Sequence, residues 1–505
     1  PWFGLIEDSY QRWSQEIGLA FSFTSGLMAE GEDDGLIAEG ENSLTALDHY
    51  VAQPDPTYSF NIISTTRGIG YTLYDLEMTS QTWRTATEVT WDQWRHRMSV
   101  IVPSLVSSSK SMLIIGGGGH DETGGHGGAA LQSTSLSAAV ALSVSSGTVV
   151  SGISNVPYQP LQFEDEDSGR VEDALIAKSY RNFLDSTDDQ WPALLPMVKS
   201  AVRAMDTVQT VAQQQNNVTV TDFVVTGGSK RGWTTWLTAA VDSRVSAIAP
   251  QVINVLNMDE QMEHHRHAYE GVTVGIIDGY STAIQDYVNE RIFDHFDEPR
   301  GLELLNIVDP YEYRDRLTMP KFMINATGDE FFVPDSDQFF YQDLPGQKYI
   351  RYVPNVGHSL THASDGNFEA INSLAQFYGA MVSGASLPEF SWTVTPDGVI
   401  DVTTVDVPVE VRLWQATNPV NRDFRQSFTG NTVQWTSSLL PPLSSGRYVS
   451  SVPRPQTGHT AHMVELTFNV AGQPMKFTTE VAVMSADPAG QFDFGPRLLS
   501  VAPNS

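Results

Sequence analysis

Short runs of apolar residues alternate with longer amphipathic stretches over most of the chain, between about residue 45 and residue 390. The stretch 191–215 repeats apolar side chains at helical spacing, for example at Leu194, Val198 and Val202. The apolar runs have the length of buried strands and lie at 99–102, 111–115, 147–151, 222–225, 246–249 and 322–324. Strands that alternate with helices in this way predict an α/β fold with a doubly wound, mostly parallel sheet.

The pattern changes after Pro388, where most apolar and polar residues alternate one by one. This period is typical of antiparallel strands that are buried on one face. Such strands are predicted at 391–402, around a Pro-Asp-Gly turn, and at 409–414, 432–435, 463–468 and 476–483. We therefore predict a C-terminal all-β, sandwich-like domain over residues 391–505. It follows an α/β domain over residues 45–390 and an acidic, glycine-rich extension over residues 1–44.

One connection inside the α/β domain is unusually long. The segment at about 253–318 lies between the apolar run 246–249 and the next predicted strand at 322–324. A crossover between neighbouring parallel strands needs far fewer residues. We expect the excess to form a helical cap over the strand ends.

The segment Thr226–Gly232 has the sequence Thr-Gly-Gly-Ser-Lys-Arg-Gly and joins an apolar strand to a predicted helix. A serine between glycines at such a turn is how an α/β-hydrolase exposes its nucleophile above the sheet. Ser229 is therefore the candidate nucleophile. The usual pattern is G-x-S-x-G, whereas here Arg231 occupies the second glycine position and the glycine follows at Gly232. A glycine-rich turn with an incidental serine is the alternative.

Two further strand ends provide the groups that such a serine needs. Asp329 follows the apolar strand around 322–324, and His358 follows a second predicted strand that begins near Lys348. The chain order Ser, Asp, His is that of an α/β-hydrolase triad, and functional groups of open α/β sheets gather at the carboxyl ends of the strands. We predict Asp329 as the acid and His358 as the base. The alternatives are Glu330, Asp335 or Asp337 for the acid and His362 for the histidine.

Four consecutive glycines, Gly116–Gly119, follow the apolar run 111–115. In the α/β-hydrolase fold an early loop of this kind donates a backbone N–H to the oxyanion, together with the residue after the nucleophile. We predict the N–H groups of Gly117, Gly118 and Lys230 as these donors. A phosphate-binding loop is the alternative, but the glycines do not lead into Gly-Lys-Ser/Thr, nor into the helix of a dinucleotide site. We predict no cofactor.

The side chains of Lys230 and Arg231 follow the nucleophile directly. They either pair with acids of this acidic chain or hold a carboxylate of the substrate, and we favour pairing because side chains after the nucleophile often turn into the helix. Arg231 remains a candidate substrate contact because a guanidinium recognises carboxylates well.

The predicted cap contains a cluster of histidines followed by a tyrosine. His264 and His267 have the i, i+3 spacing of helical metal ligands, whereas His265 faces elsewhere. A solvated polar helix and substrate contacts are both favoured over a metal site. We predict no bound metal and name His264, His267 and Tyr269 as candidate substrate contacts.

The segment 229–245, which begins Ser-Lys-Arg-Gly-Trp, resembles the signature of the PhoPQ-activated pathogenicity-related proteins. The segments 173–177, 196–206 and 413–419 are similar to that family as well, and the resemblance extends from about residue 45 to about residue 485. The family is placed among the α/β-hydrolases and includes exported proteins. The resemblance therefore implies this fold and the triad, and it leaves the substrate open. The G-x-S-x-x-G pattern is also similar, over a few residues, to the nucleophile motif of glucuronoyl esterases.

Composition limits the partners. The chain has 60 Asp and Glu against 29 Lys and Arg in 505 residues, a formal net charge of −31. Such a surface repels nucleic acids and anionic membranes, and no apolar run has the length of a membrane span. With no cysteine, disulfides and thiol catalysis are excluded. No signal peptide is visible at Pro1, and we expect a secreted or periplasmic protein whose signal peptide has been removed.

These features predict a serine hydrolase that acts on a small-molecule, peptide-linked or glycan-linked ester through an acyl-enzyme, with peptides or amides as the second substrate class. The alternative is an exported binding or signalling protein on an α/β-hydrolase scaffold that no longer catalyses a reaction. The oligomeric state is left open.

Overall fold

The computed structural model describes residues 44–121, 124, 131, 133–362, 368–429, 433–487 and 497–501. The predicted N-terminal extension lies outside the described residues, except for its last position.

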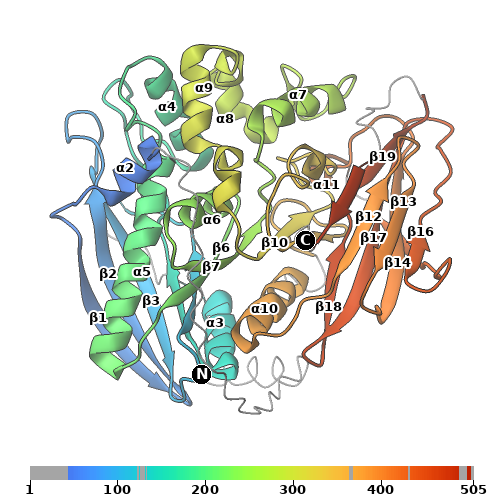
Figure 1. Ribbon diagram of the computed structural model, residues 1–505. Coiled ribbons are helices and arrows are strands. Elements are labelled where there is room, and N and C mark those ends of the chain that lie inside the picture. Colours follow the sequence, from blue (N-terminus) through green and yellow to red (C-terminus); the bar gives the residue numbers. More distant parts are fainter. Residues whose placement is uncertain are drawn as a thin grey trace.

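A central sheet with strand order β1-β2-β3-β5-β4-β6-β7-β10-β11 forms the middle of the molecule (Figure 1). Each neighbouring pair from β5 to β11 in this order is parallel, whereas the pairs β1–β2, β2–β3 and β3–β5 at one side are antiparallel. The strands are β1 (Ser59–Gly68), β2 (Tyr71–Thr82), β3 (Gln93–Pro103), β4 (Lys110–Ile115), β5 (Val149–Ile153), β6 (Asp222–Gly228), β7 (Val245–Gln251), β10 (Lys321–Ala326) and β11 (Lys348–Val353). The predicted doubly wound, mostly parallel sheet is confirmed.

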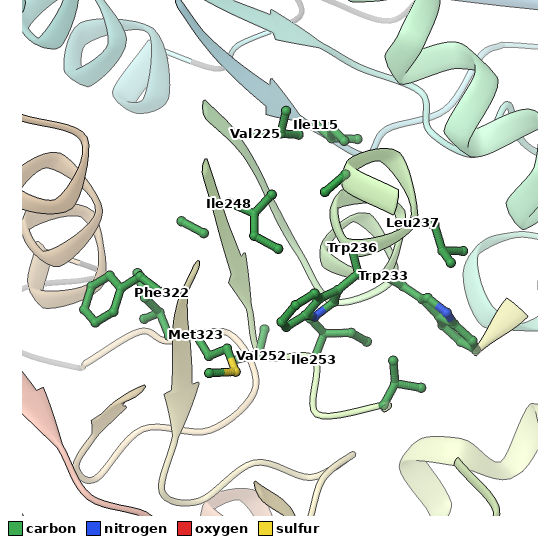
Figure 2. Close-up of a cluster of buried hydrophobic side chains, with 14 of the residues drawn as sticks. Ile115, Val225, Trp233, Trp236, Leu237, Ile248, Val252, Ile253, Phe322 and Met323 are labelled. Atoms are coloured by element: carbon green, nitrogen blue, oxygen red, sulfur yellow. The ribbon is translucent and has the colours of Figure 1, made fainter. Parts of the chain in front are cut away.

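Helices cover both faces of this sheet. Helix α5 (Leu194–Asn216) packs on β2–β5 together with α2 (Ala46–Ala52) and α6 (Lys230–Val241). Helices α3 (Ser133–Ser146) and α10 (Phe368–Ser383) contact each other and cover the opposite face. The core between α6 and the sheet is apolar and close-packed, and Figure 2 shows Trp236 of α6 beside the side chains that follow β7. This packing fixes the start of α6, where the functional site lies.

The connection from β7 to β10 forms the predicted helical cap. It contains α7 (Met258–Ala268), β8 (Ile276–Ile277), β9 (Tyr280–Ser281), η1 (Thr282–Ile284), α8 (Gln285–Asn289), η2 (Phe293–His295), α9 (Pro299–Val308) and η3 (Pro310–Arg316). Helix α4 (Glu172–Leu184) packs against α8 and α9, and these helices lie above the central strands in Figure 1. Since β7 ends at the carboxyl edge of the parallel sheet, the cap covers that edge.

The C-terminal region is rich in β-strands, as predicted, and one part of it extends the central sheet. Strands β18, β17, β14 and β15 continue the sheet antiparallel from β11, with β19 on β17, while β16, β13, β12 and β20 form a second sheet (Figure 1). Phe390 of β12 contacts Phe468 of β17 with ring centroids 5.6 Å apart, so the two sheets face each other. The elements are β12 (Phe390–Val394), β13 (Ile400–Thr404), β14 (Glu410–Asn418), α11 (Gln426–Thr429), β15 (Thr436–Leu439), β16 (Arg447–Val449), β17 (His459–Val470), β18 (Gln473–Thr478), β19 (Ala482–Ser485) and β20 (Arg497–Ser500).

The strand predicted at 432–435 is wrong for the described residues 433–435, and residue 432 lies outside the described residues. The strand begins only at Thr436, because the backbone N–H of Trp435 donates to Asn355 Oδ1 at 2.7 Å rather than to a neighbouring strand. The apolar character of this segment reflects burial of the Trp435 side chain. The boundary predicted at residue 390 remains a prediction, since hydrogen bonds join the two regions through β11 and β18.

Two buried lysines begin neighbouring strands. Lys321 of β10 and Lys348 of β11 are partners in the parallel register. The Lys321 ammonium donates to Pro345 O, and the Lys348 ammonium donates to Leu344 O at 2.6 Å. Burial lowers the pKa of Lys321 to about 7 and that of Lys348 to about 8. The two charges therefore oppose folding at neutral pH.

We expect the free energy of unfolding to rise with pH between about 7 and about 10, because the Lys321 amine in the unfolded chain keeps its proton up to a pKa of about 10.4. Replacing the amine by a thioether in Lys321→Met should weaken this pH dependence and stabilise the protein at pH 7 by roughly 2–4 kcal/mol. Urea unfolding at several pH values measures both effects. Lys110→Met, at the partly exposed start of β4, is the control. An unchanged unfolding midpoint for Lys321→Met at pH 7 contradicts the prediction.

Candidate active site

Ser229 lies at the sharp turn between β6 and α6. Its backbone has φ 58° and ψ −131°, a conformation that non-glycine residues adopt only under strain and that is typical of a nucleophile elbow. The flanking glycines are required by close contacts. A Cβ at Gly227 would lie 2.6 Å from Arg231 O, and one at Gly232 would lie 2.6 Å from Ile253 Cγ2. The displaced glycine of the G-x-S-x-x-G pattern is thus explained by the packing of α6 against the residues after β7.

The structure brings the three predicted triad residues together. His358, in the loop after β11, has Nε2 2.7 Å from Ser229 Oγ. Its Nδ1 lies 2.9 Å from Asp329 Oδ1 and 3.0 Å from Oδ2. Asp329 is 4% exposed and accepts a further hydrogen bond from the backbone N–H of Phe331 at 2.8 Å. Phe331 also packs against the imidazole, with ring centroids 4.2 Å apart. The imidazole is therefore held between the hydroxyl and the carboxylate.

The alternative acids bind groups other than the His358 imidazole. Glu330 accepts the backbone N–H of His358 at 2.8 Å and a hydrogen bond from the Ser427 hydroxyl of α11. Asp335 forms an ion pair with Arg422, and Asp337 accepts a hydrogen bond from Asn254 Nδ2 at 2.9 Å. The imidazole that reaches Ser229 belongs to His358 and not to the alternative, His362. Glu330 instead connects the histidine loop to the C-terminal region.

The predicted oxyanion donors are three backbone N–H groups beside Ser229. Within the described residues, the backbone N–H groups of Gly117, Gly118 and Lys230 donate to no other group of the protein. Gly118 has φ 119°, which a larger residue rarely adopts. Lys230 begins α6, so its N–H adds to the partial positive charge of a helix N-terminus.

Ser229 lines a pocket, the Ser229 pocket, of about 50 Å³. Its wall is almost entirely apolar and is contributed by α4, α6, the residues after β7, the cap and the turn after Asp329. The lining residues are Asp173, Ser229, Lys230, Trp233, Ile253, Val255, Met258, Met262, Ile284, Tyr287, Phe293, Phe331 and Phe332. Sequence reasoning missed the cap residues, because apolar positions on a helix are interpreted as core.

The charged side chains next to the nucleophile pair with acids, as favoured. Arg231 donates from both terminal nitrogens to the two carboxylate oxygens of Glu172, each at 2.6 Å. Lys230 Nζ lies 2.8 Å from Glu172 and 2.9 Å from Asp173. Burial alone would raise the pKa of Glu172, but the hydrogen bond from Arg231 and the two positive charges lower it to about 2. Glu172 is therefore ionised and shared, and sequence reasoning missed it because it lies far away in the chain.

The predicted substrate contacts of the cap do not line the Ser229 pocket. His264 is buried, with Nε2 3.1 Å from Asp335 Oδ1, and His267 is exposed. Tyr269 is buried beneath the Arg425 guanidinium, 4.5 Å from its ring centroid. These positions give no support for a role in substrate contact. In the part of the chain that the structure describes, no group of three or more acids and histidines is arranged to hold a metal ion.

A parallel sheet of this strand order, with a strained serine after β6 and its acid and histidine partners after β10 and β11, defines an α/β-hydrolase fold. The chain belongs to the PhoPQ-activated pathogenicity-related protein family, whose model matches residues 47–425. The resemblance inferred from sequence is thereby confirmed.

The chain is also similar to individual proteins. The chain is 35% identical over 470 residues to autocrine proliferation repressor protein A of Dictyostelium discoideum, covering 87% of this chain and 90% of the relative. Among solved structures it is similar to an acetyl xylan esterase from Paenibacillus sp. R4, with 16% sequence identity and a TM-score of 0.45. This similarity covers 66% of this chain and 91% of the esterase. The chain is also similar to an acetyl xylan esterase from Thermoanaerobacterium sp. JW/SL YS485, with 17% sequence identity and a TM-score of 0.42. This similarity covers 68% of this chain and 96% of the esterase. No helix among the described residues is long and apolar enough to span a membrane.

Proposed function

We propose that this protein is a serine hydrolase that cleaves carboxylic esters through an acyl-enzyme. The observation that supports this most directly is the continuous hydrogen-bonded chain from Ser229 Oγ through the His358 imidazole to the Asp329 carboxylate. Such a chain withdraws the proton of a weakly nucleophilic hydroxyl as it attacks.

Each group has a role in the proposed reaction. His358 Nε2 accepts the Ser229 proton as Oγ bonds to the ester carbonyl carbon, while Asp329 orients the imidazole and stabilises its positive charge. The backbone N–H groups of Lys230, Gly117 and Gly118 stabilise the oxyanion. The C–O bond to the alcohol then breaks, and the alcohol leaves with the proton from His358. Water, deprotonated by the same imidazole, attacks the acyl-enzyme and releases the acid and Ser229.

Esters of small molecules, peptides or glycans are the proposed substrates, and peptide bonds are the second class. We also propose that the protein acts after export. A non-catalytic signalling role on the same scaffold is the competing hypothesis, and the name of the Dictyostelium relative is compatible with it. Arg231, which occupies the usual glycine position of the nucleophile motif, gives this hypothesis no support, since its pairing with Glu172 explains it.

A fluorophosphonate probe separates these hypotheses. We expect covalent labelling of Ser229, located by peptide mass spectrometry, and hydrolysis of nitrophenyl esters that the probe abolishes. Aminoacyl nitroanilides, tested in parallel, measure cleavage of amide bonds. A folded protein that neither labels nor hydrolyses any ester contradicts the proposed function.

A further inference from the structure

We propose that the Ser229 pocket receives a short acyl group. This inference rests on the proposed hydrolase function and specifies its substrate. The pocket volume is about 50 Å³, whereas an apolar cavity of about 150 Å³ holds a benzene ring. By this comparison the pocket accommodates an acyl chain of about two to four carbons, such as acetyl or butyryl.

The chemistry of the wall supports an aliphatic occupant. Met258 and Met262 of α7 and Phe293 of η2 form the cap side of the pocket. Its few polar groups are already satisfied, since the Tyr287 hydroxyl donates to Asp173 at 3.0 Å and Lys230 Nζ lies 2.9 Å from the same carboxylate. Added methylenes therefore gain from burial until the pocket is full.

The same wall disfavours a peptide substrate. An acylamino group attached beside the reacting carbonyl would place an amide N–H and C=O against the side chains of Met262, Ile284 and Phe293. These side chains offer no hydrogen-bond partner, and burying an amide without one is costly. The pocket thus favours simple acyl esters over peptide bonds.

A series of nitrophenyl esters with two, four, eight and twelve acyl carbons tests the proposal on the full chain. We expect kcat/KM to be highest at two or four carbons, because each methylene that fits contributes up to about fourfold. It should fall by about 50-fold or more at eight carbons, where the chain must displace the wall. A maximum at eight or twelve carbons overturns the proposal.

Enlarging the pocket should change this preference. In Met262→Ala we expect the eight-carbon to two-carbon ratio of kcat/KM to rise about tenfold or more, since the removed side chain leaves space for additional carbons. Ile284→Ala is the second variant, in case Met262→Ala does not fold. Met381→Ala, the same change on α10 away from the pocket, should leave the ratio as in the wild type. An unchanged ratio in the folded pocket variants overturns the proposal, whereas the absence of any ester hydrolysis by the wild type contradicts the hydrolase function itself.

A separate observation supports a second proposal, which concerns the side chains that contact the loop Gly116–Gly119. We propose that Arg231 is a positioning residue that holds Gly116–Gly119 ready to receive the oxyanion. Arg231 Nε donates to Val156 O at 2.5 Å, and the other two nitrogens donate to Glu172. A Cβ at Gly117 would lie 2.5 Å from Arg231 Nη2, so the guanidinium is in direct contact with the loop.

Gln159 fixes the next part of the same loop. Its Nε2 donates to Gly118 O at 3.0 Å, while its Oε1 accepts the backbone N–H of Glu172 at 2.6 Å. The loop is thus held at Gly117 and Gly118 by a network centred on Glu172. N–H donors that are fixed in advance stabilise a developing oxyanion without reorganisation during the reaction.

Arg231→Lys tests this role, because lysine keeps the charge but cannot reach Glu172 and Val156 at once. Misplacing oxyanion donors should lower kcat by about 10- to 100-fold with KM changed less than about threefold. A trifluoromethyl ketone, whose hemiketal oxyanion occupies the same site, should bind more weakly by the factor that kcat/KM loses. Arg203→Lys, on α5 with an acidic partner in Asp206, is the control.

The outcomes separate positioning from other roles. A folded Arg231→Lys protein with unchanged kcat and inhibitor affinity overturns the proposal, and an increase in KM alone would assign Arg231 to substrate binding instead. If Arg231→Lys does not fold, Gln159→Met serves as the second variant, because it removes the hydrogen bond to Gly118 O. It should also lower kcat and the inhibitor affinity with little change in KM, but by smaller factors. An unchanged kcat in folded Gln159→Met overturns the proposal as well.

Discussion

Ser229→Ala should lower kcat for ester hydrolysis by at least about 10³-fold and by up to about 10⁶-fold, because alanine has no hydroxyl to form the acyl-enzyme. The rate enhancement that remains would come from the oxyanion donors and from substrate binding alone. Steady-state hydrolysis of the best nitrophenyl ester, together with loss of fluorophosphonate labelling, measures the effect.

The Ser229→Ala variant removes the hydroxyl alone, and the chain offers a matched control. Alanine keeps a Cβ at a position whose backbone has φ 58°, so the turn keeps its steric constraints and only the hydroxyl is lost. Ser383→Ala, an exposed serine on α10, is the matched control and should retain full activity. If Ser229→Ala keeps more than a tenth of the wild-type rate, another group is the nucleophile and the proposed mechanism is wrong.

Much of the fold follows from the sequence because the period of apolar residues directly reflects burial. The runs at 111–115 and 222–225 lie in β4 and β6, which are buried on both faces, and 191–215 corresponds closely to α5. The three polar residues at strand ends were found for a related reason. Parallel strands end at one edge, so Ser229, Asp329 and His358 had to lie near one another.

Other parts depend on tertiary contacts that no local pattern encodes. The alternating period predicts β18, but it does not predict that β18 pairs with the edge strand β11. The i, i+3 spacing of His264 and His267 suggested metal or substrate contacts, whereas the structure pairs His264 with Asp335, which lies far away in the chain. The wall of the Ser229 pocket is likewise contributed by Met262 and Phe293 of the cap, which look like ordinary core residues in the sequence.

The adjacent acids show how geometry decides between residues that the sequence cannot distinguish. Both Asp329 and Glu330 follow β10, and both contact His358. Asp329 receives the ring Nδ1–H, whereas Glu330 accepts the backbone N–H of the histidine and is bound by Ser427 of the C-terminal region. One acid therefore acts on the imidazole, and the other holds the loop that carries it.

The same chemical change at these two positions should consequently have very different effects. Asp329→Asn should lower kcat by about 10⁴-fold, because an amide at this position favours the wrong imidazole tautomer and cannot stabilise the imidazolium. Glu330→Gln should cost at most about tenfold, since the amide oxygen can still accept the backbone N–H of His358. Values of kcat for the two folded variants on one ester give the comparison. If the order is reversed, Glu330 is the triad acid and the hydrogen bonds between Asp329 and the imidazole are structural.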